Sequence, residues 1–202
     1  ATRQLAQNLG IRPAVLPMSD TPCPTIVISD EGELDFQTYF VLRACEPPVR
    51  GLRWENADSA QTTPEVQSAL DKADLVVICP SNPFVSIDPI LNLPGVRAAL
   101  RSIPTLAVSP ILGGRTIKGP AAKMFAELGH AAAPTARDVA AYYQDLLDGF
   151  ILDQLDSDLT TQIEALGVKA AAMPTLMLDL AHQKQVARGL LKFGARLAKK
   201  AR

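Results

Sequence analysis

The stretch VVICPSNPFVSIDPI, residues 76–90, decides the fold class of this chain. Its apolar start is typical of a strand buried in a sheet, and the strand ends abruptly at the Pro-Ser-Asn-Pro turn, residues 80–83. Asn and Ser favour such turns because their side chains bond readily to nearby backbone. Two interpretations stay open. The turn only ends the strand, or Ser81, Asn82 and Ser86 face a ligand at the edge of the sheet.

From residue 75 onward, apolar strand-like runs alternate with segments of helical periodicity. Strands are expected at 75–79, 105–108, 149–153 and 168–173, and helices at 94–102, 119–129, 136–148, 159–167 and 178–198. This alternation predicts parallel βαβ units, and therefore an α/β fold with a mainly parallel sheet and helices on both faces. No repeat or linker divides the sequence, so we expect a single domain over residues 1–202.

The first part of the chain is less regular. Helical periodicity starts at the first residue and stops at Gly10, and a short buried strand is expected at 14–16. Two β-rich runs around residues 30–32 predict a hairpin insertion at about 24–41, beside the main sheet. The other expected elements are a strand fragment with Trp54 and a helix that starts at Pro64 with Thr63 as its N-cap.

Composition excludes several classes of protein. The chain is 48% hydrophobic and 20% charged with a net charge of −1, which is typical of a soluble domain and gives no general attraction to nucleic acid or to an anionic membrane. The basic end, residues 199–202, is interpreted as a solvated terminus rather than a binding arm. Three cysteines without disulfide or metal spacing favour a reducing compartment, so we expect a cytoplasmic protein, with Cys79 buried in its strand.

Polar turns follow three of the expected strands. They are residues 17–20 after strand 14–16, residues 80–83 after strand 75–79, and residues 109–114 after strand 105–108. Because ligands of open parallel sheets bind beyond the carboxyl ends of the strands, each turn is a candidate site. Hydroxyls and backbone amides there suit a phosphate or a nucleotide.

The glycine-rich loop after the third of these turns resembles a P-loop only in part. Gly114 and Gly119 have the required spacing, but Pro120 and Ala121 stand where Lys and Ser or Thr are needed, so a Walker A loop is excluded. Lys123 falls in the first turn of the following helix, where a cation is unfavourable unless an anion is near. It is interpreted either as an anion-binding residue or as an exposed lysine without a role.

Acidic and basic residues elsewhere give weaker signals. A group of aspartates is crowded enough to suggest a metal, although most such acids are solvated or cap helices: Asp145, Asp148, Asp153, Asp156 and Asp158. His130 and His182 lack a Ser or Cys partner in any motif, so nucleophilic triad chemistry is not indicated. The residues alone do not name a reaction.

Several long segments resemble the family of 2-phospho-L-lactate transferases, which act in the biosynthesis of coenzyme F-420. The resemblance lies, in chain order, in LPMSDTP, LDFQTYFV, CEPPVRG, VVICPSNPFVSIDPIL, LPGVRAAL, AVSPILGGRTIKGPAAKM and YYQDLLDGFILD. It implies a Rossmann-like core and a Mg²⁺-dependent reaction. In that reaction a guanosine-diphosphate-activated lactyl or enolpyruvyl phosphate is transferred to the deazaflavin 7,8-didemethyl-8-hydroxy-5-deazariboflavin (Fo), and GMP is released.

The resemblance also suggests which residues bind the substrates. The hypothesised nucleotide- or substrate-binding residues are Met18, Ser19, Asp20, Ser81, Asn82, Pro83, Ser86, Ser109, Gly113, Gly114, Gly119 and Lys123. Lys123 would supply a countercharge to the diphosphate. No catalytic residue is assigned.

Family members begin with a Gly-rich loop of the GGxGGAK kind and an acidic segment resembling SPDLD, and neither occurs here. We therefore expect an N-terminally truncated family domain whose metal ligands lie in the absent part. It would work as a homodimer or with a partner chain that supplies that part. The alternative is a non-catalytic guanine-nucleotide-binding domain or subunit.

Overall fold

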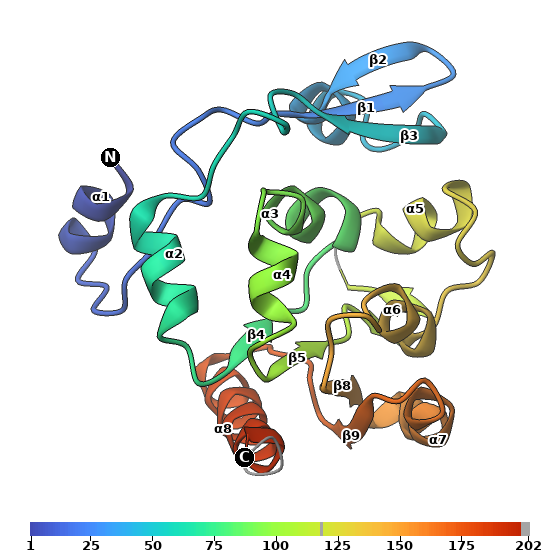
Figure 1. Ribbon diagram of the computed structural model, residues 1–202. Coiled ribbons are helices and arrows are strands. Elements are labelled where there is room, and N and C mark those ends of the chain that lie inside the picture. The colour runs from blue at the N-terminus through green and yellow to red at the C-terminus, as the bar shows by residue number, and fades with distance from the viewer. Residues whose placement is uncertain (118, 199–202) are drawn as a thin grey trace.

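The computed structural model describes residues 1–117 and 119–198, shown in Figure 1. The interpretation of residues 199–202 as a solvated terminus falls outside this part of the chain. Within it, no helix is long and apolar enough to cross a membrane.

A parallel sheet forms the centre of the described molecule. Its strands lie in the order β4 (Val76–Ile78), β5 (Thr105–Val108), β8 (Gly149–Asp153) and β9 (Lys169–Met173). All three neighbouring pairs are parallel. The predicted α/β fold with a parallel sheet is therefore confirmed.

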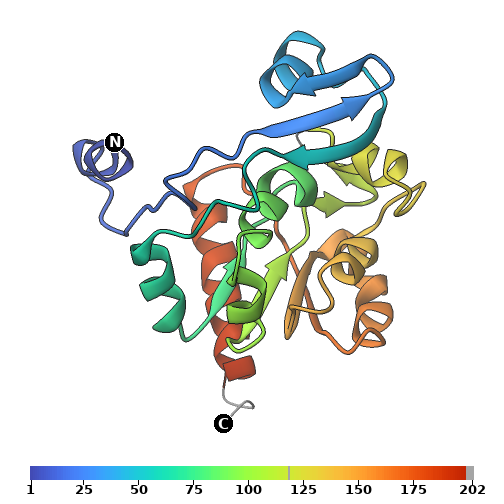
Figure 2. The same cartoon turned by 45° about the horizontal axis from the view of Figure 1, so that its top comes forward.

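Helices cover both faces of this sheet (Figures 1 and 2). Ala107, Phe150 and Leu152 point to the face that carries most of the apolar core, which they share with Phe125 and Val139. That face is covered by α3 (Asp88–Leu91), α4 (Val96–Leu100), α5 (Ala121–Glu127) and α6 (Ala136–Tyr142). The last helix, α8 (Leu180–Ala198), lies on the opposite face, and α7 (Thr160–Glu164) packs beside β9.

The long helix α8 approaches the sheet very closely. A Cβ atom added at Gly149 of β8 would lie 2.6 Å from Leu197 and 2.7 Å from Phe193. A Cβ atom at Gly194 of α8 would lie 2.4 Å from Leu75. Glycine at these positions lets the helix and the sheet come into contact.

A second, antiparallel sheet lies outside the main one. We call residues 25–54 the β-lobe: β1 (Thr25–Ser29) pairs with β2 (Gly32–Asp35) and with β3 (Val49–Trp54). The predicted hairpin and the strand at Trp54 are present, but they belong to one three-stranded sheet.

The second strand of the predicted hairpin is confirmed over residues 32–35, but its expected continuation to about residue 41 is wrong. Instead of a strand, the chain turns after Asp35 into η1 (Thr38–Leu42), a short π-helical segment. The Asp35 carboxylate accepts the Thr38 N–H at 3.0 Å and also the Thr38 hydroxyl, which ends the strand and starts the helix. Capping by Asp overrides the β propensity of the aromatic residues that follow.

The region before β4 confirms some expectations and corrects others. Helix α1 (Thr2–Asn8) is present, and α2 (Pro64–Asp71) starts as predicted, with the Thr63 hydroxyl accepting the Val66 N–H at 3.2 Å. The predicted strand at 14–16 is absent from the described structure, where this segment has no regular secondary structure. The prolines on either side of it, at 13 and 17, lack the N–H that a ladder needs.

Cys79 is exposed, so its predicted burial is wrong. It follows Ile78, the last residue of β4, and β4 is an edge strand of the described sheet. The remaining elements are η2 (Pro83–Ile87), β6 (Ile111–Leu112), β7 (Arg115–Thr116) and η3 (Gln154–Leu159).

Candidate functional site

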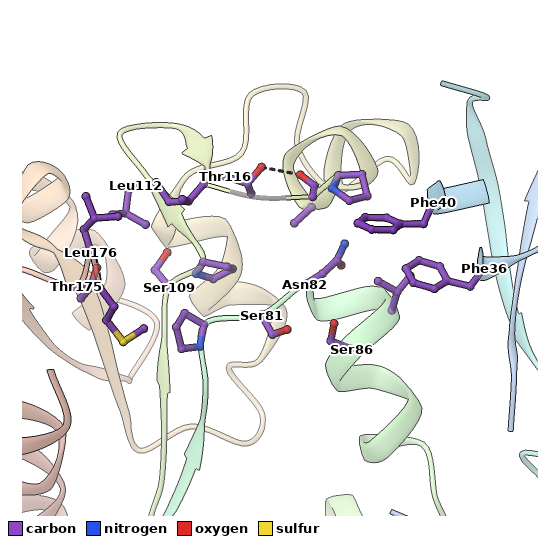
Figure 3. Close-up of a pocket in the computed structure, with 18 residues that line it drawn as sticks. Phe36, Phe40, Ser81, Asn82, Ser86, Ser109, Leu112, Thr116, Thr175 and Leu176 are labelled. Carbon is purple, nitrogen blue, oxygen red and sulfur yellow. Dashed lines mark hydrogen bonds between the residues drawn. The ribbon is translucent and has the colours of Figure 1, made fainter. Parts of the chain in front are cut away.

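A cavity of about 550 Å³ opens beyond the carboxyl ends of β4, β5 and β9 (Figure 3). Its walls come from the turn after β4 together with η2, the chain from Ser109 to the start of α5, the residues after β9, and the β-lobe. This edge of a parallel sheet is where the fold class binds ligands. The two predicted turns after β4 and β5 thus meet in one hollow, and their role as ligand contacts stays a prediction.

Five of the hypothesised binding residues line this cavity, and seven do not. Ser81, Asn82, Ser86, Ser109 and Gly119 line it. The lining does not include Met18, Ser19, Asp20, Pro83, Gly113, Gly114 or Lys123. Pro83 is buried as the first residue of η2, directly behind the lining residues Ser81 and Asn82.

The two serines on the floor of the cavity have available hydroxyls. Ser81 is half-buried and Ser86 is exposed, and neither hydroxyl has a hydrogen-bond partner among the described residues. In Figure 3 both lie between Phe36 and Phe40 on one side and the loop after β5 on the other. Both hydroxyls can donate to a phosphate oxygen.

Asn82 is used mainly to build the turn. Its Oδ1 accepts the Phe84 N–H at 3.0 Å, and its Nδ2 donates to the Met124 sulfur at 3.3 Å. The side chain therefore caps η2 and fixes it against α5. For Asn82 the simpler of the two interpretations, a strand-ending turn, accounts for its contacts.

Ser109 also has a structural role. It is fully buried, and its hydroxyl donates to the Ile111 carbonyl at 2.8 Å and accepts the Ile111 N–H at 3.1 Å. These bonds close the turn between β5 and β6. Both capacities of the hydroxyl are engaged, which leaves Ser109 as a wall of the cavity.

The glycine-rich loop is a small hairpin of β6 and β7. Gly113 and Gly114 form its tip with φ of +56° and +73°, a left-handed conformation that favours glycine. The Gly113 N–H donates to the Asp156 carboxylate at 3.0 and 3.1 Å, so this amide is already bonded. Farther along, the Thr116 hydroxyl donates to the Gly119 carbonyl at 3.1 Å, beside the cavity.

Lys123 points away from the cavity, into the contact between α5 and the β-lobe. Its Nζ donates to the Glu127 carboxylate at 2.7 Å and to the Pro47 carbonyl at 2.9 Å, and it lies 3.5 Å from the Tyr39 hydroxyl. The charge already has an anionic partner four residues along its own helix. This position gives no support to the hypothesised countercharge.

The segment with Met18, Ser19 and Asp20 lies apart from the cavity lining. Met18 packs against the main core, and Ser19 pairs with Thr62 while its hydroxyl accepts the Thr21 N–H at 3.1 Å. The strand that would have led this turn to the sheet edge is absent from the described structure, which removes the reason for grouping it with the other two turns.

The aromatic and apolar walls of the cavity were not predicted from the sequence. Phe36 and Phe40 of the β-lobe line the cavity on one side, and Thr175, Leu176 and Met177 line it after β9. In Figure 3 the two phenylalanines lie opposite Leu112 and Leu176. The four-residue spacing of Phe36 and Phe40, which places both on one helical face, was the available signal.

The predicted aspartate cluster does not form a metal site. Among residues 1–117 and 119–198, no group of three His, Cys, Asp or Glu side chains is arranged to hold an ion. The acids have other partners: Asp145 with Arg101 at 2.7 Å, Asp148 with the Thr105 N–H at 2.8 Å, Asp153 with the Thr175 N–H at 2.7 Å, and Asp156 with Gly113. The described residues therefore offer no three-ligand site for the magnesium ion that the family resemblance implies.

Asp153 shows how these bonds act. Burial by itself would raise the pKa of this carboxyl, but hydrogen bonds from the Leu155 N–H and from the N–H and hydroxyl of Thr175 lower it below its usual range. The ionised carboxylate thus fixes the start of the segment 175–177, which lines the cavity.

A buried polar cluster lies behind the floor of the cavity. Asp88, at the end of η2, accepts the Tyr142 hydroxyl, and burial raises the pKa of Asp88 although this hydrogen bond works in the opposite direction. The other Asp88 oxygen and the Tyr143 hydroxyl are buried without a partner among the described residues. The pair Asp88 and Tyr142 connects the segment that carries Ser81 and Ser86 to α6.

The chain is an α/β protein with a cavity at the carboxyl edge of a helix-covered parallel sheet, the place where proteins of this fold class commonly bind small molecules. Residues 1–186 match the model of the family described as 2-phospho-L-lactate transferase CofD, and the chain belongs to that family.

Relatives from several organisms support this membership. The 2-phospho-L-lactate transferases of Methanosarcina mazei and Methanothermobacter thermautotrophicus are 37% and 38% identical over 93% and 92% of this chain, and the phosphoenolpyruvate transferase of Streptomyces coelicolor is 36% identical over 90%. The alignments cover 61%, 59% and 58% of these relatives, so the chain spans about 60% of their length.

A solved structure shows the same fold. It is a member of the UPF0052 family from Bacillus halodurans, with a TM-score of 0.62 at 16% identity, over 88% of this chain and 60% of that one. At this identity the likeness concerns the fold alone.

Proposed function

We propose that this chain forms part of a transferase of coenzyme F-420 biosynthesis. The transferase moves a 2-phospholactyl or enolpyruvyl phosphate group from a guanosine-diphosphate-activated donor to a ribityl hydroxyl of Fo. The bond from that hydroxyl oxygen to phosphorus forms as the phosphorus–oxygen bond to GMP breaks, and the hydroxyl proton is lost. Family membership and the names of the relatives support this assignment.

The observation that carries the proposal is the cavity at the sheet edge, in a chain that the family model matches over residues 1–186. It combines unbonded hydroxyls at Ser81 and Ser86 with an apolar wall at Phe36 and Phe40. Transfer through a charged phosphoryl centre depends on positioning and on donors aimed at its oxygens. Ser81 and Ser86 are the donors we assign to the phosphates.

The remaining parts of the proposal lie outside the described residues. We also propose that the reaction needs Mg²⁺ and that residues beyond this chain contribute to holding it, because the described residues offer no three-ligand metal site. We also propose a cytoplasmic enzyme that works as a homodimer, or with a partner chain that supplies the rest of the family's length.

The test supplies Fo, Mg²⁺ and a guanylated phospholactate or phosphoenolpyruvate, and follows formation of F-420-0 or its dehydro form together with GMP release. It is run with this chain alone and with a polypeptide that supplies the N-terminal part of the relatives. Turnover in either arm supports the transferase. The comparison of the two donors identifies the group that is moved.

No turnover in either arm would overturn the transferase assignment. If guanine nucleotide then still bound, with a dissociation constant that depends on Ser81 and Ser86, the chain would be a nucleotide-binding domain without catalysis. Calorimetric titration with GDP on the same preparations separates these outcomes.

A further inference from the structure

We propose that Asp88 is a positioning residue for the phosphate donor Ser86, and that an anion bound at Ser86 favours the uncharged form of the Asp88 carboxyl. The inference rests on the proposed function for the role of Ser86. It goes beyond that function because Asp88 does not line the cavity and acts on it through η2. A buried acid thereby sets how the binding of an anionic ligand depends on pH.

Two buried side chains anchor η2 on the side away from the cavity. Phe84 and Asp88 are 2% and 4% exposed. Ser86 lies halfway between them in the chain, is exposed and lines the cavity (Figure 3). Residues four apart in a helical segment share a face, whereas a residue two positions along does not. The two anchors therefore determine where the Ser86 hydroxyl stands.

Both anchors contact the same tyrosine of α6. The Phe84 ring packs edge-on against Tyr142, with 5.2 Å between the ring centroids, and against Phe125, with 4.8 Å. The carboxylate of Asp88 accepts the Tyr142 hydroxyl through Oδ2. Tyr142 thus holds η2 at one anchor by packing and at the other by a hydrogen bond.

The second oxygen of Asp88 indicates an uncharged acid. Oδ1 is buried without a hydrogen-bond partner among the described residues, and so is the hydroxyl of Tyr143. A buried carboxylate needs several donors to offset its lost hydration, and in the described structure only Tyr142 supplies one. Burial accordingly raises the pKa of Asp88, and burial together with the nearby Asp88 charge raises that of Tyr143.

The other titratable and charged groups around Asp88 do not offset this burial. Arg97 of α4 lowers the Asp88 pKa less than burial raises it, and its guanidinium lies 3.4 Å from the Asp145 carboxylate. The two tyrosines at the end of α6 stay protonated, because burial raises the pKa of both phenols. His130, which follows α5, stacks its ring on Phe84 with 5.4 Å between the centroids.

The charge of a bound phosphate acts on this acid. Ser86 is two residues from Asp88, so an anion at Ser86 brings a like charge near Asp88 through a protein interior that screens it poorly. Where Asp88 is ionised in the free protein, binding therefore draws up to one proton from solvent onto its carboxylate. Affinity for the anion should fall as the pH rises through the folded-state pKa of Asp88, because binding then has to include this proton uptake.

The test titrates GDP calorimetrically into the chain alone and into the chain with the complementary N-terminal polypeptide. Each titration is repeated in two buffers of different ionisation enthalpy, which counts the protons taken up. The wild type is compared with Asp88→Asn, which keeps an acceptor for Tyr142 and cannot ionise. Protons that the phosphates of GDP themselves exchange are common to both proteins and cancel in the difference.

We expect the wild type to take up more protons than Asp88→Asn on binding GDP. Its dissociation constant should rise relative to that of the variant by roughly 3- to 10-fold between about pH 5 and pH 8. The two proteins should bind alike at the acidic end of this range, where Asp88 is uncharged.

Two further variants separate position from charge. Tyr142→Phe removes the hydrogen bond that opposes burial in setting the Asp88 pKa and keeps the ring beside Phe84, so the fall in affinity should move to higher pH. Asp88→Ala lacks both the hydrogen bond and the charge. It should weaken GDP binding at every pH, whereas Asn at the same position restores it. A merely structural role lowers thermal stability without moving the pH profile.

Asp71→Asn is the matched control, because Asp71 is an exposed acid of α2 that bonds to Gln67 of the same helix and does not line the cavity. It should bind GDP with the affinity and the proton uptake of the wild type. His130→Gln removes the neighbouring imidazole, and the pH profile should survive this change. Thermal melting shows that each variant folds.

Several results would overturn the inference. They are equal proton uptake and equal pH dependence in the wild type and Asp88→Asn, a pH profile that His130→Gln abolishes, or no binding of GDP in either form of the wild-type protein. The proposed function fails separately: GDP binding that depends on Asp88 as expected, without any transfer to Fo, would overturn the transferase and leave Asp88 its role. Transfer with a pH profile of GDP binding that Asp88→Asn does not change would do the reverse.

Discussion

The Glu127 carboxylate of α5 accepts the Val49 N–H of β3 at 2.9 Å, and so joins the α/β core to the β-lobe. The same carboxylate accepts Lys123, which in turn donates to the Pro47 carbonyl. Both partners are largely shielded from water, with 32% and 21% of the Lys123 and Glu127 side chains exposed. Because the β-lobe carries the Phe36 and Phe40 wall, this junction determines where one side of the cavity stands.

We therefore predict that Glu127→Leu destabilises the fold by about 2 kcal/mol, since it leaves the Val49 N–H and the Lys123 ammonium without their charged acceptor. Urea unfolding at pH 7 measures the change in free energy. The control is Glu33→Leu, which removes an exposed pair with Arg53 in the same lobe and should cost less than about 1 kcal/mol. Equal losses for the two variants would contradict the role of the junction.

The parts of the fold that the sequence predicted correctly are those where local pattern and tertiary environment agree. The run 149–153 is apolar up to its last residue, Asp153, and is buried throughout, and Thr63 caps α2 as its position before Pro64 indicates. The turn at η1 was missed because Phe36, Tyr39 and Phe40 favour strands on their own. Its cause is a cap from Asp35 together with burial of Tyr39, and the second of these depends on distant parts of the chain.

The candidate site shows the same contrast between features that follow from local sequence and features that depend on the tertiary structure. Its location could be predicted, because parallel strands bring their carboxyl ends to one edge and polar turns follow β4 and β5. Which side chains keep polar groups available for a ligand could not be predicted, because this depends on the hydrogen bonds that close each turn. The Ser109 hydroxyl donates to the Ile111 carbonyl, and the Lys123 ammonium donates to the carbonyl of Pro47, 76 residues away in sequence.

The serines of the cavity differ in their hydrogen bonds, so their alanine variants should differ in stability. Ser81→Ala and Ser86→Ala should change the free energy of unfolding by less than about 0.5 kcal/mol, because neither hydroxyl has a partner among the described residues. Both should weaken GDP binding in a calorimetric titration. Ser109→Ala should instead destabilise the fold by about 1 kcal/mol, since it leaves the Ile111 N–H without its acceptor. Stable serine variants that bind GDP like the wild type would remove Ser81 and Ser86 from the site.

Asp88 gives stability a definite dependence on pH. Burial raises its pKa in the folded protein above the ordinary value of 3.8, so the folded state holds the proton when the unfolded chain has lost it. Its contribution to stability is therefore fully present below pH 3.8 and is lost as the pH rises through the higher folded-state pKa. Asp88→Asn, which cannot ionise, should lack this loss, and its stability relative to the wild type should rise between about pH 4 and neutrality.

Urea unfolding of both proteins at several pH values in this window measures the difference. Asp153→Asn is the control, because its stability relative to the wild type should stay constant in this window and should change only at lower pH. Burial of Asp153 is outweighed by the hydrogen bonds that lower its pKa, so its contribution is present above pH 3.8 and is lost as the pH falls through its folded-state pKa. A stability difference between Asp88→Asn and the wild type that stays constant with pH would refute the assignment.

The contact between α8 and the sheet predicts the outcome of a single added methyl group. In Gly149→Ala the new Cβ would lie 2.6 Å from the Leu197 side chain and 2.7 Å from the Phe193 ring, closer than packed carbon atoms can approach, so these side chains or α8 itself have to shift. We expect a loss of about 1–3 kcal/mol in the free energy of unfolding, as for other overpacked cores. The matched control is Gly51→Ala in β3, where the added Cβ would meet its nearest neighbour, in Ile28, at 3.4 Å, an ordinary packing distance. Its change should stay within about 0.5 kcal/mol. If Gly149→Ala proved as stable as Gly51→Ala in the same urea titration, the close approach of α8 to β8 would be disproved.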